Sequence, residues 1–150
     1  MLYSGYTKIE NLEEYTGLKC LWLENNGIDK IENLEQQTEL RNLYLHYNVI
    51  SKIENIEHLQ LLDTINLCHN FVQRLESLGT LPVLHTLHIS HNHLHTYSDI
   101  DELRHCHNLA VVDLSFNHLD DPLIIQVTYF IADFPIIPVL QATHVTWPSH

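Results

Sequence analysis

Basic residues are scarce in this 150-residue chain. Seven lysines and arginines stand against 19 aspartates and glutamates, which gives a formal net charge of −12. A nucleic-acid-binding domain would show a basic patch, and an anionic membrane surface would repel so acidic a chain. The composition therefore predicts neither a nucleic-acid partner nor a membrane partner.

Glycine and cysteine are also few. The four glycines are not clustered, so there is no glycine-rich phosphate loop, and neither a nucleophile elbow nor a zinc-protease motif occurs. Cys20, Cys68 and Cys106 are odd in number and form no C-x-x-C motif. The first residues lack the basic and apolar regions of a signal peptide. These absences predict a protein that is not an enzyme, has no cofactor and works in a reducing, cytoplasmic compartment.

One phrase, L-x-x-L-x-L-x-x-N, recurs five times. It opens at Leu18, Leu40, Leu62, Leu84 and Leu109, and it closes at Asn26, Asn48, Asn70, Asn92 and Asn117. The starts are 22, 22, 22 and 25 residues apart. This motif and period are the signature of leucine-rich repeats. They predict an α/β solenoid: a right-handed curved superhelix with a parallel β-sheet on its concave side and 3₁₀ turns or short helices on its convex side.

The repeats indicate a single domain over residues 1–150. We expect a partial first repeat at 1–17, repeats starting at 18, 40, 62, 84 and 109, and a divergent C-terminal cap or tail at 123–150. The fourth repeat is longer, and its Ser98-Asp99-Ile100-Asp101 is similar to a capping box, which predicts a short helix there. The tail is apolar but interrupted, so we expect a cap helix rather than a membrane span.

The outward positions of the strands suggest the working surface. Aromatic residues recur there among polar ones, although packing of the core does not require them at outward positions. This composition is typical of protein-binding patches. The predicted partner-binding residues are Trp22, Glu24, Arg41, Tyr44, His46, Tyr47, His69, His88, His91, Asp113 and Phe116.

Thirteen histidines raise the alternative of a metal site. His69, His88 and His91, with Cys68, fall on adjacent strands, and zinc accepts such ligands. Alternate strand positions diverge, however, and the spacing matches no established site. We therefore predict no metal and interpret the histidines as neutral polar surface that becomes charged below a pH of about 6.5.

Several segments are more specific than any repeat consensus. They are GYTKIENLEEYTGLKCLWLE at residues 5–24, LPVL at 81–84, SHNHL at 90–94 and VDLS at 112–115. Over roughly residues 5–122 the chain resembles the leucine-rich-repeat axonemal dynein assembly factors. The resemblance implies a cytoplasmic scaffold that helps to preassemble dynein arms for cilia and flagella, with dynein chains or assembly chaperones as partners. We expect the chain to be a monomer. It supplies no catalytic residues.

A second resemblance concerns the repeat class alone. The 22-residue period also looks like that of the phosphatase-1-regulating leucine-rich-repeat subunit. The alternative function is therefore a regulatory adaptor of another complex, such as a phosphatase. A metal-dependent or hydrolytic enzyme is the third and weakest hypothesis.

Overall fold

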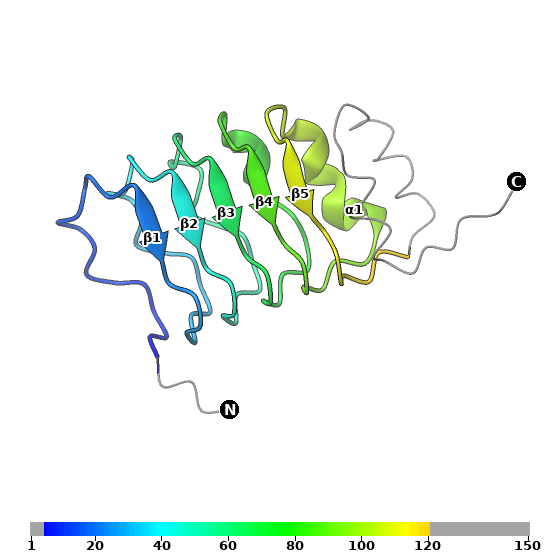
Figure 1. Ribbon diagram of the computed structural model, residues 1–150, viewed down its shortest axis with the longest axis horizontal. Coiled ribbons are helices and arrows are strands. Elements are labelled where there is room, and N and C mark those ends of the chain that lie inside the picture. Colours follow the sequence, from blue (N-terminus) through cyan, green and yellow to red (C-terminus); the bar gives the residue numbers. More distant parts are fainter. Residues whose placement is uncertain (1–4, 121–150) are drawn as a thin grey trace, which may run out of the picture.

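The computed structural model describes residues 5–120, and these form a solenoid with one short strand in each repeat (Figure 1). The strands are β1 (Cys20–Trp22), β2 (Asn42–Tyr44), β3 (Thr64–Asn66), β4 (Thr86–His88) and β5 (Val111–Asp113). They pair in parallel in the order β1-β2-β3-β4-β5, and equivalent residues of successive repeats lie opposite one another. The predicted leucine-rich-repeat fold is confirmed.

Each strand alternates between the core and the solvent side. The central residue is buried, as Leu43 is in β2, and its two neighbours are more exposed. Backbone bonds continue beyond the assigned strands, since the amide of Leu45 donates to the carbonyl of Asn66 at 2.8 Å and that of Tyr47 donates to Cys68 at 3.0 Å. The sheet therefore positions outward side chains along a longer segment than its three-residue strands suggest.

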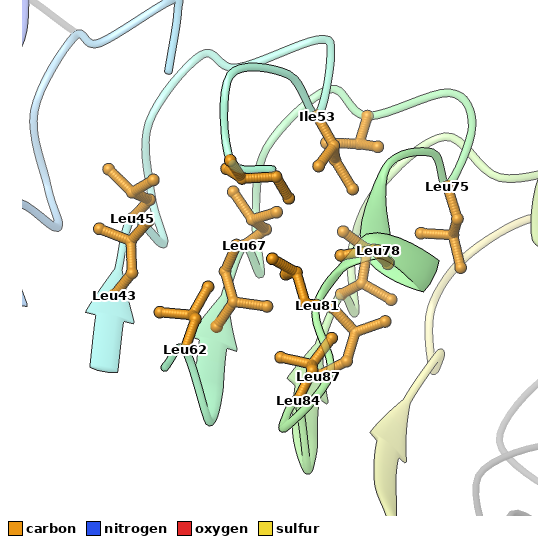
Figure 2. Packing of buried hydrophobic residues seen from close by; sticks show 14 of the residues in the cluster. Leu43, Leu45, Ile53, Leu62, Leu67, Leu75, Leu78, Leu81, Leu84 and Leu87 are labelled. Carbon is orange, nitrogen blue, oxygen red and sulfur yellow. The ribbon is translucent and has the colours of Figure 1, made fainter. Parts of the chain in front are cut away.

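Leucine and isoleucine columns fill the space between the sheet and the convex turns (Figure 2). Leu45, Leu67 and Ile89 occupy equivalent positions in three successive repeats and are fully buried. Each such side chain contributes about 1.5–3 kcal/mol through the removal of apolar surface from water. One continuous core thus runs through the stack, and it holds the sheet against the convex turns.

The asparagines that close the phrases form a buried hydrogen-bond ladder. The Oδ1 atom of Asn48 accepts the backbone N–H of Ile28 at 3.0 Å. Its Nδ2 atom donates to the carbonyls of Leu23 at 2.8 Å and Leu45 at 3.0 Å. Equivalent bonds recur at Asn70, Asn92 and Asn117. Because a buried amide needs partners, this ladder keeps successive repeats in register.

A second asparagine ladder, which the motif did not predict, runs along the convex edge. Asn11, Asn33 and Asn55 have φ values of 62°, 58° and 57°, in the left-handed region that asparagine tolerates better than most residues. Asn33 Nδ2 donates to the carbonyl of Ile9 at 2.7 Å, and Asn55 Nδ2 donates to that of Ile31 at 2.8 Å. The 22-residue spacing of these asparagines was the available signal.

The convex side carries only short helical turns: η1 (Leu78–Thr80), α1 (Tyr97–Ile100) and η2 (Asp101–His105). A short helix in the longer fourth repeat was predicted, but its capping box was placed two residues too late. Thr96 is the N-cap, and Asp99 Oδ2 accepts the backbone N–H groups of Thr96 and His95, each at 2.9 Å. Asp99 stands three residues after Thr96, so the box closes there rather than between Ser98 and Asp101.

Between residues 5 and 120 no helix has the length and apolar character needed to cross a membrane. The cap predicted for residues 123–150 lies outside the described residues.

Candidate protein-binding face

The sheet side of the solenoid presents a column of outward residues at the ends of the strands. The register places Trp22, Tyr44, Asn66, His88 and Asp113 side by side. The rings of Trp22 and Tyr44 stack with their centroids 5.6 Å apart and an angle of 10° between their planes. Trp22 is 62% exposed. A large, rigid aromatic surface is therefore open at the first two repeats.

A second column follows three residues later, where each repeat turns away from its strand. Tyr47, His69, His91 and Phe116 all have φ between 53° and 57°. Their rings stack in sequence, with centroid separations of 4.2, 3.9 and 4.2 Å. Left-handed backbone costs about 1–2 kcal/mol at residues other than glycine, and the solenoid offsets this cost with bonds such as Tyr47 N–H to the Cys68 carbonyl.

His46 joins the two stacks. Its ring lies edge-on to that of Tyr44 at 6.5 Å and to that of Tyr47 at 5.9 Å. The result is an uninterrupted path of ring contacts along the sheet side, which we call the aromatic ladder. Its members are Trp22, Tyr44, His46, Tyr47, His69, His91 and Phe116.

A polar column lies between the two stacks, and its members are Glu24, His46, Cys68, Ser90 and Ser115. The hydrogen bonding of its side chains differs between its two ends. In the later repeats its members are paired: Ser90 Oγ donates to Cys68 Sγ at 3.1 Å, and Ser115 Oγ donates to Asp113 Oδ1 at 2.6 Å. In the first two repeats Glu24 Oε2 and His46 Nδ1 are buried and have no hydrogen-bond partner. The N-terminal end of the face therefore has unsatisfied hydrogen-bonding capacity.

Burial and neighbouring charge alter the acid–base properties of this face. Burial lowers the pKa of His69 below its ordinary value, and the nearby charges of His91 and His46 lower it further. Burial also raises the pKa of the Cys68 thiol. Both groups are thus uncharged at neutral pH, and the centre of the face is a neutral, polarizable surface.

The structure brings together most of the predicted site residues. Seven form the aromatic ladder, and His88 and Asp113 lie beside it in the strand column. Glu24 adjoins His46 in the polar column. Arg41 is exposed but precedes β2, whereas the ladder rings lie at or beyond the ends of the strands.

One further ring column was not predicted. Phe71 is 48% exposed and stacks on His93 at 5.4 Å, and His118 continues the column beside His93 and His95. The 22-residue spacing of Phe71 and His93 was the available signal. This column lies two residues beyond the stacked Tyr47 column and extends the ring-lined surface.

The geometry of the histidines bears on the metal alternative. His69 and His91 lie face to face with an angle of 15° between their planes, so their ring nitrogens do not converge on a common point. Within the described part of the chain, no three His, Cys, Asp or Glu side chains are arranged to hold a metal ion.

The parallel sheet and the asparagine ladder together define a leucine-rich-repeat solenoid. Solved structures agree. An internalin (inlF) from Listeria monocytogenes superposes with a TM-score of 0.72 and 28% identity over 78% of this chain and 34% of that one. The Drosophila melanogaster SNF/U2A' complex contains a chain with a TM-score of 0.65 and 25% identity, over 77% of this chain and 69% of that one.

Sequence comparison finds relatives that share one name. The chain is 79% identical, over 125 residues, to dynein axonemal assembly factor 1 of Rattus norvegicus, across 83% of this chain and 20% of the relative. The predicted resemblance is confirmed. The chain spans about a fifth of the length of the mammalian relatives it matches. No family model matches it. The names of these relatives are those of an assembly factor rather than an enzyme.

Proposed function

We propose that this chain is a non-enzymatic, protein-binding scaffold that takes part in the assembly of axonemal dynein arms. The observation that carries the proposal is its 79% identity, over 125 residues, to a protein named as a dynein axonemal assembly factor. The matched segment is a fifth of that relative. The function assigned to this segment is therefore recognition of a protein partner, not the whole activity of the relative.

The geometry of the sheet side supports this assignment. Trp22, Tyr47 and Phe116 are 62%, 47% and 60% exposed, although they belong to a stacked and hence rigid array. Large rings held in one orientation offer much contact area at little cost in conformational entropy, which makes them good anchors for a partner. The structural neighbour from Drosophila melanogaster was solved as part of the SNF/U2A' complex.

The partners we propose are dynein chains or assembly chaperones. We propose that the chain acts in the cytoplasm, in association with the cilium or flagellum, and that it is a monomer. The net charge of −12 supports protein partners over nucleic acid. The alternative function, regulation of a phosphatase, is supported by the 22-residue period alone. The experiment below therefore includes recovery of a phosphatase as one of its outcomes.

An affinity pull-down tests the proposal. The tagged chain is incubated with cytoplasmic extract of ciliated cells, and axonemal dynein heavy chains and phosphatase subunits are both quantified. Two variants are compared with wild type: Trp22→Ala removes the most exposed ring of the ladder, and Gln36→Ala changes an exposed convex residue. We expect wild type and Gln36→Ala to recover dynein chains and Trp22→Ala to recover about tenfold less, as for a hot-spot residue.

Three results would contradict the proposal. Recovery of a phosphatase without dynein chains would favour the regulatory alternative. Equal recovery of dynein chains by wild type and Trp22→Ala would show that Trp22 of the aromatic ladder does not contribute to binding. A larger loss of dynein chains for Gln36→Ala would place the binding face on the convex side. Circular dichroism of each variant establishes that it is folded.

A further inference from the structure

The unsatisfied polar atoms at the N-terminal end of the sheet side point to the chemistry of the partner. Glu24 and His46 occupy equivalent positions of successive repeats, and each has one buried side-chain atom without a hydrogen-bond partner. The same position is occupied by Cys68 and Ser90 in the next two repeats, where the two side chains bond to each other. Within this column, the unpaired buried atoms therefore occur in the first two repeats.

The chemistry of Glu24 specifies what is missing. An ionised carboxylate only accepts hydrogen bonds, and a buried oxygen without a donor costs about 1–3 kcal/mol. In residues 5–120 no lysine or arginine lies within ion-pair distance of Glu24. Oε2 itself is buried, but the side chain as a whole is half-buried, so another part of it is exposed on the sheet side. The group that would complete it is a cationic donor.

Aromatic rings lie on the same face of the sheet as this carboxylate. Trp22 and Glu24 are alternate residues of one extended segment and so point to the same face, as do Tyr44 and His46. Trp22 and Tyr44 are stacked and Trp22 is largely exposed. The face of an indole or phenol ring attracts a cation, more strongly where water is partly excluded. Carboxylate and rings therefore favour the same kind of ligand.

The charge of the whole chain agrees with a cationic ligand. The formal net charge is −12, with only seven lysines and arginines. Such a field attracts basic segments over distances comparable to the Debye length, about 8–10 Å at physiological ionic strength. A basic segment is thus favoured in the encounter as well as in the bound state.

We infer that Trp22, Glu24, Tyr44 and His46 form a binding site for an arginine side chain in an extended, basic segment of the protein partner. The inference rests on the proposed function only in taking the partner to be a protein. The guanidinium donates to the Glu24 carboxylate and lies against the rings of Trp22 and Tyr44. With its own proton on Nε2, His46 accepts a further N–H at Nδ1. Arginine fits better than lysine because its planar group donates in several directions while it stacks.

The test uses the full chain and a synthetic pentapeptide, acetyl-Gly-Arg-Ser-Arg-Gly-amide. The matched control peptide carries citrulline, which is nearly isosteric with arginine but uncharged. Binding is followed by two-dimensional NMR, with wild type, Glu24→Gln and Gln36→Ala compared. We expect shift changes centred on Trp22, Tyr44 and His46, and affinity lowered about tenfold or more by Glu24→Gln or by citrulline, as for a charge-assisted hydrogen bond. Gln36→Ala binds as wild type does.

A second measurement is independent of the peptide. If the Glu24 carboxylate lacks a donor in the free protein, Glu24→Gln leaves the melting temperature unchanged or raises it. A lower melting temperature would show that the protein itself satisfies the carboxylate, and would overturn the inference. Equal binding of the citrulline peptide, or shift changes centred elsewhere, would overturn it as well.

The inference and the proposed function fail separately. Peptide binding at this site without recovery of dynein chains would leave the arginine site standing and reject the assembly role. Equal recovery of dynein chains by wild type and Glu24→Gln would support the assembly role and reject the arginine site.

Discussion

Single asparagine side chains connect the repeats of this solenoid. Asn70 Nδ2 donates to the carbonyls of Leu45 and Leu67, at 3.0 and 3.1 Å, and its Oδ1 accepts the amide of Ile50 at 3.0 Å. Each of these backbone groups is buried and has lost its contact with water. The side chain therefore compensates groups in two repeats at once, which is why an amide recurs where the core otherwise requires apolar residues.

Replacing Asn70 with alanine should lower the free energy of unfolding by about 1–3 kcal/mol, because it leaves buried backbone groups unpaired. Replacement of the exposed Lys52 with alanine is the control and should cost less than about 0.5 kcal/mol. Urea unfolding measures both. Equal losses would mean that the ladder is not what holds the repeats together.

The convex ladder yields a prediction that separates strain from hydrogen bonding. Asn55 has φ of 57° and donates to the carbonyl of Ile31. Asn55→Ala loses the hydrogen bond but keeps a Cβ atom in left-handed backbone, so the cost of that conformation is no longer offset. Asn55→Gly loses the same bond but has no Cβ atom. We expect the alanine variant to be less stable than the glycine variant by about 1 kcal/mol, as measured by urea unfolding. The same stability for both would show that the backbone relaxes.

At the scale of elements, the stacked rings form a unit that crosses several repeats. The turn after each strand is left-handed, and this directs Tyr47, His69, His91 and Phe116 along one line. The pKa of His69 is lowered by burial and by its histidine neighbours. The folded state therefore binds a proton at His69 less readily than the unfolded state does.

This difference predicts how stability depends on pH. The contribution of His69 is fully present above its unfolded pKa of about 6.5 and is lost as pH falls from there through the lower folded pKa, because the unfolded state takes up the proton first. The urea midpoint should accordingly decrease between pH 7.5 and 5.5, and decrease less in His69→Phe. His107→Phe, at an exposed position outside the ladder, is the control. A slope in His69→Phe as steep as that of wild type would contradict the assignment.

At the scale of the whole molecule, residues 5–120 form a one-dimensional stack, in which each inner repeat is buried by its neighbours on either side. The column of Leu23, Leu45 and Leu67 shows the consequence. Leu67 lies between repeats and is fully buried, whereas Leu23 directly follows the first strand and is only half-buried. Chemically identical residues thus contribute differently according to their place in the stack.

Matched truncations of that column test this view. Leu67→Ala should cost about 2–5 kcal/mol, since it leaves a cavity in the continuous core. Leu23→Ala should cost about 1 kcal/mol, since less apolar surface is removed from water there. Chemical unfolding of both variants gives the comparison. Equal costs would indicate that the first repeat is as well covered as the central ones.

The sequence alone determined the fold, the residues of each strand that point outward and the columns in which they align. These follow from local pattern and from a fixed period, because residues 22 apart occupy the same position in successive repeats. The placement of Trp22 beside Tyr44, and of His69 beside His91, could be predicted for that reason. The helix start at Thr96 could not, since two serine or threonine caps with a following aspartate competed within a few residues.

Only the tertiary structure decided what those neighbours do to one another. Ring stacking requires the left-handed backbone at Tyr47 and its equivalents, and this conformation depends on bonds to the next repeat. The lowered pKa of His69 follows from its burial and from the nearby charges of His91 and His46, which depend on how the repeats pack. The unpaired oxygen of Glu24 likewise reflects the environment that neighbouring repeats create. Period and polarity are properties of the chain, whereas burial and contact geometry arise only when the repeats pack together.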